Sequence, residues 1–153
     1  MFKYTIRAVT EGDQIGRQKV LDFATNELRR IYQPVSKKEI RETLPDGVLV
    51  SVNESLVIGT VEYILDKGFV SVQGVAIHPN YRKQGVCRLL VETVADLARQ
   101  LNYPALSLSV IEETGNVRVF EKLGFRVVAS STDTNYIGPN GEKVRCVEMV
   151  RKL

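Results

Sequence analysis

The sequence has little of what metal sites and disulfide scaffolds require. Among 153 residues there are two cysteines, Cys87 and Cys146, and one histidine, His78. The cysteines are far apart and form no Cys-x-x-Cys pair, so a zinc site has almost no ligands and we expect no metal. Two free thiols in a chain of this size are typical of a reducing compartment, which predicts a cytoplasmic protein.

Long apolar runs and long basic runs are also missing. No stretch approaches the roughly 18 apolar residues of a membrane span, and the first seven residues lack the apolar core of a signal peptide. The 21 lysines and arginines are interleaved with 18 aspartates and glutamates, which leaves a net charge of +3. This mild excess favours an anionic ligand, while neither a nucleic acid nor a membrane is expected as a partner.

What is present is the composition of an ordinary globular protein. Hydrophobic residues make up 44% and charged residues 25% of the chain. At this length about 68–70% of the unfolded surface can be buried, so a core forms without disulfides or metals. There are no repeats, linkers or low-complexity stretches, and we expect one domain over residues 1–153.

Hydrophobic periodicity and turn residues predict an alternation of strands and helices. Gly68 is expected to adopt a positive φ in a tight hairpin loop, and Gly141 ends a second turn signal. Residues 74–77 are apolar on both sides, as in a central strand. The expected elements are strand 4–9, helix 12–32, a short helix that the Ser36 and Glu39 capping box begins and that ends near Leu44, strands 48–52, 57–65 and 69–77, helix 86–101, strand 105–110, helix 114–123, and strands 125–131 and 144–151.

Each predicted helix has one apolar face that should be buried. These faces consist of Ile15, Val20, Phe23, Ala24, Leu28 and Ile31 in the first long helix, of Val86, Leu89, Leu90, Val94, Leu97, Ala98 and Leu101 in the second, and of Val117, Phe120 and Leu123 in the third.

The most informative segment is the strand–loop–helix unit over residues 72–101. A basic loop that contains Gly85 leads directly into a helix with no acidic residue in its first turn. The first N–H groups of a helix lack intrahelical partners and lie at the positive end of its dipole. A phosphate can accept those hydrogen bonds, and glycine lets the backbone approach it closely. The pattern indicates either an anion site or an ordinary exposed loop.

Two motifs resemble one known family. The loop 78–87, with Arg82-x-x-Gly85-x-Cys87, resembles the pyrophosphate-binding loop R/Q-x-x-G-x-G/A of the GNAT superfamily of N-acetyltransferases. Phe-Glu-Lys-Leu-Gly-Phe at 120–125 is similar to the family's Y-E-K-L-G-F segment, and 5–7 and 148–153 are similar to its first and last strands. The resemblance covers essentially the whole chain. We expect an α/β fold with a mixed, mostly antiparallel sheet of about seven strands and helices on both faces.

The resemblance implies that the chain moves an acetyl group from acetyl-CoA to the amine of a small molecule or peptide. In such proteins the pantetheine arm lies in a gap between two splayed strands and pairs with strand backbone. Carried over residue by residue, the strand backbone is that of Val75, Ala76 and Ile77. The pyrophosphate is held by main-chain N–H groups of Arg82, Lys83, Gln84, Gly85, Val86 and Cys87, with help from Arg88.

The sequence departs from the family pattern at three positions. Cys87 replaces the usual Gly or Ala. Glu113 stands where many members have an Asn that contacts the cofactor, and Asn116, one helical turn later, is the candidate substitute. Phe120 stands where the family usually has a Tyr that protonates the departing CoA thiolate, and phenylalanine has no proton to give.

Several side chains have both a catalytic and a structural interpretation. Cys87 is either an acyl-carrying nucleophile or a small packing residue, and His78 is either a base or a polar residue at a strand end. Glu112 and Glu113 either draw a proton from the amine through water or attract a cationic amine, or they are a solvated pair that begins a helix. Tyr136 is either the replacement proton donor or a structural tyrosine. The basic residues Arg29, Arg30, Lys37 and Lys38 form a solvated face or contact an acidic acceptor.

The leading functional hypothesis is direct attack of a primary amine on acetyl-CoA in a ternary complex. Positioning and backbone N–H groups that stabilise the oxyanion supply most of the catalysis. The alternative is an acyl-CoA-binding or regulatory domain without catalysis, which Phe120 favours. The acceptor amine and the oligomeric state, with a homodimer as one alternative, are open at this level.

Overall fold

The computed structural model describes residues 4–34 and 44–153. The short helix expected from Ser36 and Glu39 lies outside these residues, as do Lys37 and Lys38. The described strands are β1 (Thr5–Ala8), β2 (Gln33–Pro34), β3 (Gly47–Asn53), β4 (Leu56–Leu65), β5 (Val70–Ile77), β6 (Ala105–Ile111), β7 (Arg126–Ile137) and β8 (Lys143–Lys152). The helices are α1 (Gln14–Ile31), α2 (Val86–Gln100) and α3 (Asn116–Glu121), with short 3₁₀ turns η1 (Glu11–Asp13), η2 (Pro79–Tyr81) and η3 (Glu112–Thr114).

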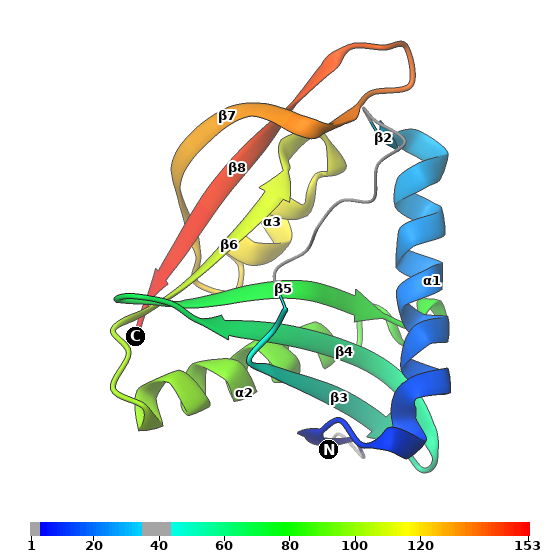
Figure 1. Ribbon diagram of the computed structural model, residues 1–153, viewed down its shortest axis with the longest axis vertical. Helices are drawn as coiled ribbons and strands as arrows, with labels where there is room; N and C mark the ends of the chain where they lie inside the picture. The colour runs from blue at the N-terminus through cyan, green and yellow to red at the C-terminus, as the bar shows by residue number, and fades with distance from the viewer. Residues whose placement is uncertain (1–3, 35–43) are drawn as a thin grey trace.

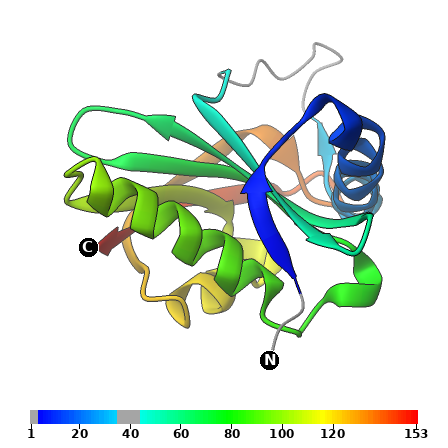
Figure 2. The same ribbon diagram turned by 90° about the horizontal axis from the view of Figure 1, so that it is seen from below.

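All described strands join one twisted sheet. Their order is β1-β3-β4-β5-β6-β8-β7-β2, and every neighbouring pair is antiparallel except β5 and β6. The sheet thus has seven longer strands and the two-residue β2 at one edge. The views in Figures 1 and 2 show α1 and α2 on opposite sides of β3, β4 and β5. The expected mixed, mostly antiparallel α/β fold is confirmed.

Two apolar clusters, one on each side of the sheet, hold the helices in place. Side chains alternate between the faces of a strand, so Leu49 and Ile58 pack with α2 while Val50 and Val57 pack with Val20 of α1. The α2 cluster is the larger of the two and also contains Phe120 and Leu123, which attach α3 to the same side.

The apolar face predicted for α1 is only partly buried. Val20 is 1% exposed, whereas Ile15 is 77%, Phe23 43% and Ile31 53% exposed. The helix α1 meets the sheet at Val20, whereas Ile31 lines a cavity described below and Phe23 contacts the ring of His78. The prediction that Ile15, Phe23 and Ile31 are buried was therefore wrong.

The other helices differ from the prediction mainly at their ends. Leu101 is 49% exposed because α2 has ended before it, and Val91 and Ala95 lie in the core although the pattern did not select them. The helix expected over 114–123 is divided by Gly115, whose φ of +79° cannot belong to a right-handed helix. Strand β7 continues past Ser131 to Ile137 because it pairs with both β8 and β2.

A bulge in β5 shapes the centre of the sheet. Thr60 pairs with Ala76 and Glu62 pairs with Gln73, so two residues of β5 stand opposite the single residue between them on β4. Gly74, at this bulge, has a φ of +59°. The extra residue changes the alternation: Val70 and Val72 face the α2 core before it, and Val75 and Ile77 face the same core after it.

Strands β5 and β6 separate beyond their first two residues. Their ladder contains only Val70 with Leu106 and Ser71 with Ser107, and the two strands diverge clearly in Figure 1. The apolar character predicted on both sides of residues 74–77 is present, because Val75 and Ile77 pack against the α2 core and Ala76 is buried in the cluster under α1. The backbone of this later half of β5, however, has no β6 partner.

Candidate functional site

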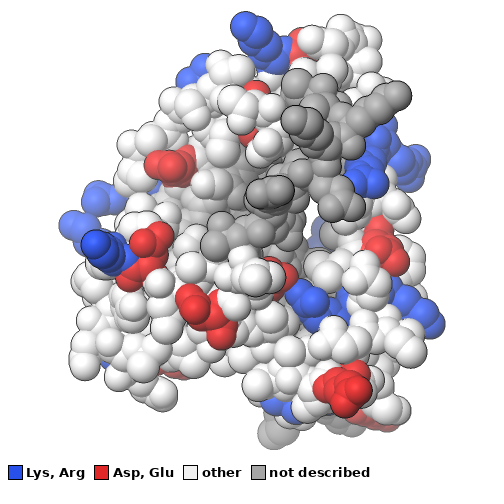
Figure 3. Space-filling model, viewed as in Figure 1, with Lys and Arg blue, Asp and Glu red and all other residues white. Residues whose placement is uncertain are grey.

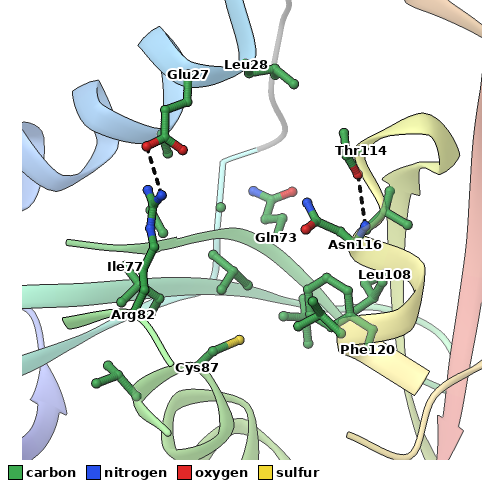
Figure 4. A pocket seen from close by; sticks show the side chains of 18 of the residues that line it. Glu27, Leu28, Gln73, Ile77, Arg82, Cys87, Leu108, Thr114, Asn116 and Phe120 are labelled. Carbon is green, nitrogen blue, oxygen red and sulfur yellow. Dashed lines mark hydrogen bonds and ion pairs between the residues drawn. The ribbon is translucent and has the colours of Figure 1, made fainter. Parts of the chain in front are cut away.

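A cavity of about 770 Å³ occupies the space where β5 and β6 separate. Its walls come from the C-terminal half of α1, the later part of β5, the loop before α2, strand β6 and α3, as Figure 4 shows. The described lining residues are Ala24, Glu27, Leu28, Ile31, Tyr32, Val72, Gln73, Gly74, Val75, Ala76, Ile77, Tyr81, Arg82, Lys83, Gly85, Val86, Cys87, Leu108, Ser109, Val110, Thr114, Asn116, Val119 and Phe120.

The loop before α2 has the geometry of an anion site. Lys83 and Gly85 both adopt left-handed backbone, with φ of +61° and +83°. Alternation of this kind turns successive N–H groups into one concave surface. The α2 helix begins at Val86 with no side-chain cap and no acidic residue in its first turn. Its first N–H groups and its dipole therefore favour a negatively charged ligand.

Two residues predicted for this loop lie outside the cavity. Gln84 accepts a hydrogen bond from the Tyr4 hydroxyl at 2.7 Å and donates to the Asn80 carbonyl at 3.1 Å. Arg88 is exposed, and its guanidinium reaches the Lys122 carbonyl at 3.5 Å. Among the residues that the structure describes, the cations that line the cavity are Arg82 and Lys83.

Aromatic side chains pack against one another next to this loop. The ring of His78 contacts Phe23 of α1 and Tyr81 of η2, at centroid distances of 5.2 and 5.6 Å. His78 Nδ1 accepts from the Asn80 N–H at 3.1 Å, and the Tyr81 hydroxyl accepts from Asn53 at 3.2 Å. His78 does not line the cavity, so this geometry favours its structural interpretation.

The bulged half of β5 lies between the cavity and a buried polar cluster. Glu62 of β4 is buried and pairs with Arg17 of α1 at 2.6 Å, and it accepts from the Gln73 amide at 3.1 Å. A Cβ on Gly74 would come within 3.2 Å of the Glu62 carboxyl group. Glycine therefore lets the strand pass over this carboxylate, and Val75, Ala76 and Ile77 then line the cavity.

Cys87 lines the cavity as a thiol. It is half-buried in the first turn of α2, and burial raises its pKa to about 11, although the nearby Arg88 acts in the opposite direction. The neutral thiol is thus the dominant form at pH 7. This environment disfavours an acyl-carrying nucleophile at Cys87.

The far wall of the cavity contains the other two departures from the family pattern. Phe120 is buried, lines the cavity and meets Phe125 edge to face at 5.9 Å. Asn116 lines the cavity at the start of α3, where its N–H donates to the Thr114 hydroxyl at 3.2 Å. Glu113 instead accepts from the Arg145 N–H. Asn116 is therefore the better placed of the two to contact a ligand.

The two predicted catalytic residues are not among the residues that line the cavity. Glu112 is exposed in η3. Tyr136 is half-buried in β7, where its backbone pairs with Pro34 and its N–H donates to Asp133 at 2.7 Å. Both stay predictions from the sequence.

Sequence reasoning missed several polar residues of the cavity, among them Glu27, Tyr32 and Gln73. Tyr32 is 6% exposed just after α1, and burial, assisted by Glu113 and Glu142, raises its pKa, so the hydroxyl keeps its proton. Glu27 pairs with Arg82 at 2.8 Å across the cavity (Figure 4). The spacing of Ala24, Leu28 and Ile31 was the available signal, because Glu27 flanks this apolar line.

The surface carries charges of both signs. Figure 3 shows Lys and Arg interspersed with Asp and Glu over this face, without one large patch of a single sign. Within residues 4–34 and 44–153, no group of three or more His, Cys, Asp or Glu side chains is placed to hold a metal ion. No helix in these same ranges is long and apolar enough to cross a membrane.

Comparison with solved structures gives similar folds over nearly the whole chain. A GCN5-related N-acetyltransferase from Kribbella flavida has a TM-score of 0.76 and 20% identity, with 99% of this chain and 98% of that chain covered. The ribosomal-protein-S18-alanine N-acetyltransferase from Escherichia coli has a TM-score of 0.71 and 17% identity, with 97% and 93% covered. A GNAT family acetyltransferase from Elizabethkingia anophelis with acetyl-CoA bound has a TM-score of 0.70 and 16% identity, with full coverage of both chains.

At these identities the structural neighbours show the fold alone. No curated protein sequence matches the chain. The model of the acetyltransferase (GNAT) family, however, matches residues 18–125, which contain most of α1, the bulged strand, the anion loop and α3. The chain therefore belongs to the GNAT family of acetyltransferases.

Proposed function

We propose that the protein is an N-acetyltransferase that moves the acetyl group of acetyl-CoA to a primary amine by direct attack in a ternary complex. The observation that carries this proposal is that an open strand edge and the anion loop are continuous within one cavity. The half of β5 that has no β6 partner continues through η2 into the anion loop and the first turn of α2. Three solved neighbours are described with acetyl-CoA, which supports this ligand.

The residues present fit such a ligand. In our proposal the main-chain N–H groups of residues 82–88 hold the diphosphate, because the loop is concave and α2 adds its dipole. The backbone of Val75, Ala76 and Ile77 offers hydrogen bonds to an extended arm, since β6 does not pair with it. Asn116 and Phe120 complete the opposite wall.

The reaction needs few side chains. The amine nitrogen attacks the thioester carbonyl carbon, a C–N bond forms, the C–S bond breaks, and the ammonium proton leaves while the thiolate gains one. Holding both substrates in one cavity removes much of the entropic barrier, and N–H groups of β5 stabilise the oxyanion. Phe120 gives no proton, so Tyr32 joins Tyr136 as a candidate hydroxyl donor.

The proposal includes the setting of the reaction. The free thiols of Cys87 and Cys146 favour a reducing compartment, and we keep the cytoplasm as the proposed location. We treat residues 1–153 as one catalytic domain. No metal, nucleic acid or membrane takes part in the proposed reaction.

The binding half of the proposal is tested by Gly85→Glu. The new carboxylate would occupy the anion loop, so we expect calorimetry to show loss of CoA binding with the fold retained by circular dichroism. Gly68→Glu is the matched control, because Gly68 has nearly the same φ of +80° and open space around it in a hairpin turn. Equal CoA affinity in wild type and Gly85→Glu would show that the site is assigned wrongly.

The catalytic half is tested by thiol release from acetyl-CoA with a panel of polyamines, amino acids, aminoglycosides and peptides. We expect at least one amine to be acetylated. Phe120 gives a specific reason for a second candidate function, an acyl-CoA-binding domain without catalysis. Tight CoA binding without turnover across the panel would favour that second function.

A further inference from the structure

An ion pair joins the anion loop to the opposite wall of the cavity. Arg82, the first residue of the loop, extends away from α2 toward α1, where its guanidinium donates to Glu27 Oε1 at 2.8 Å (Figure 4). Both side chains line the cavity, and 40% of the Arg82 and 48% of the Glu27 side chain are exposed. The pair therefore lies at the mouth of the cavity, within reach of solvent and ligand.

Glu27 is the one carboxylate among the described residues that line the cavity. Its neighbours on the same wall are apolar, with Ala24 and Leu28 on the adjacent positions of the helix face. The buried carboxylate of Glu62 is already paired with Arg17. A cationic group that enters the cavity thus finds its anionic partner at Glu27, which Arg82 neutralises in the structure.

A diphosphate would compete with Glu27 for Arg82. An exposed ion pair is weak because water screens it and two long side chains must be held in one geometry. A diphosphate carries more charge than a carboxylate, and the arginine fork matches phosphate oxygens well. Once a diphosphate lies in the loop beside Arg82, the guanidinium can exchange its single hydrogen bond to Glu27 for bonds to phosphate.

We propose that Glu27 is the residue that binds the acceptor. We propose further that acetyl-CoA frees the Glu27 carboxylate, because its diphosphate replaces Glu27 as the partner of Arg82. The acceptor class is then an aliphatic amine that is protonated at neutral pH, held through its ammonium group beside the apolar wall of α1. This inference rests on the proposed function and adds the substrate's charge and the order of binding, with acetyl-CoA first.

The exchange of Arg82 is tested by a double-mutant cycle on CoA affinity, measured by calorimetry. Because Glu27→Gln removes the competitor for Arg82, it should tighten CoA binding about two- to fivefold, the range that one exposed ion pair supports. In an Arg82→Gln background the same change should have no effect. Dephospho-CoA, which keeps the diphosphate, should show the same tightening as CoA.

Asp22→Asn is the matched control. Asp22 is an exposed carboxylate on α1 that accepts from Gln18 and does not line the cavity, so its removal changes the net charge equally. It should leave CoA affinity unchanged. Weaker or unchanged CoA binding in Glu27→Gln, or equal tightening in Asp22→Asn, would overturn the exchange while leaving the CoA site of the proposed function intact.

The acceptor role is tested with the amine that gives the largest thiol release in the panel above. Glu27→Gln should raise the KM for that amine about tenfold with little change in kcat, and Asp22→Asn should change neither. An unchanged KM in Glu27→Gln would contradict the acceptor role. Absence of turnover in wild type with CoA still bound would overturn both the acceptor role and the enzymatic function.

Discussion

At the scale of single residues, two side chains of the cavity differ from the family pattern: Cys87, whose thiol stays protonated, and Phe120, which lacks a hydroxyl. Cys87 occupies a position where a smaller residue is usual in the family, and its raised pKa keeps it protonated. Phe120 stands where the family resemblance implies a tyrosine that donates a proton, and its side chain has no hydroxyl. Both features are consistent with direct attack by the amine, which needs no acyl-enzyme and tolerates a weaker acid.

Cys87→Ala should keep or increase activity, because it restores the commoner family residue and removes no required group. With a pKa of about 11, only about one Cys87 in 10⁴ is a thiolate at pH 7, so alkylation by iodoacetamide should be slow and should accelerate as the pH rises toward 10. CoA should protect the thiol in a Cys146→Ser background. Mass spectrometry that detects an acetyl adduct on Cys87 during turnover would contradict this prediction.

Phe120→Tyr should preserve or raise kcat, because a positioned acid is typically worth about 10²–10⁴-fold in rate. Two further variants identify the proton donor. Tyr136→Phe removes the candidate from the sequence analysis, and Tyr32→Phe removes the tyrosine that lines the cavity. We expect the variant that loses the proton donor to lower kcat with little change in CoA affinity. A kinetically silent Tyr136→Phe would leave Tyr136 a structural role only.

At the scale of elements, the bulge in β5 shapes the wall of the cavity. Gly74 permits a positive φ and the close passage over Glu62. The bulge also changes which residues of β5 face the α2 core. It lies in the part of β5 that has no β6 partner, so it sets the direction of the side chains along the open backbone edge.

Gly74→Ala should destabilise the protein by about 2–3 kcal/mol, since a left-handed alanine costs about 1–2 kcal/mol and its Cβ also crowds Glu62. Gly68→Ala carries only the backbone cost, because nothing lies within 4 Å of its Cβ position. Urea unfolding and CoA calorimetry of both variants separate the two effects. We expect CoA binding to weaken in Gly74→Ala alone, and equal losses in both variants would argue against the crowding.

At the scale of the whole molecule, ion pairs attach the start of α1 to the sheet. Asp13 accepts from the Arg7 guanidinium at 2.6 and 2.9 Å and from the Thr10 N–H at 2.7 Å. These hydrogen bonds, with that from Arg7 the largest cause, hold the pKa of Asp13 well below its usual range. The stabilisation that they provide is complete above the unfolded pKa of about 3.9 and declines as the pH falls below it.

Asp13→Asn should lower the free energy of unfolding by about 1–2 kcal/mol at pH 7, because the partly exposed Arg7 guanidinium and the Thr10 N–H lose a charged acceptor. The difference from wild type should shrink at pH 2.5, because Asp13 of the unfolded chain, with a pKa of about 3.9, is protonated there and must give up that proton on folding. Urea unfolding at both pH values measures this, with Asp22→Asn as an exposed control that stays within about 0.5 kcal/mol of wild type. A gap that does not change with pH would mean that the carboxylate charge is not its cause.

The sequence by itself determined the features that depend on a few neighbouring residues. Glycines and polar turns predicted the hairpin at Gly68 and the turn at Gly141, both of which have positive φ, and periodicity predicted the order of strands and helices. The basic glycine loop before α2 was also readable, because a few consecutive residues decide its backbone and charge.

Only the tertiary structure decided what each apolar stripe and each carboxylate faces. The apolar stripe on α1 predicts a face buried in the core, yet its C-terminal part lines a cavity because β5 and β6 separate beside it. Glu27 meets Arg82 although they are 55 positions apart in the sequence, while Glu112 and Tyr136 are absent from the lining. Periodicity tells which side of an element is apolar, but the distance between elements is set by their packing, and a site assembled across that distance has no local signature.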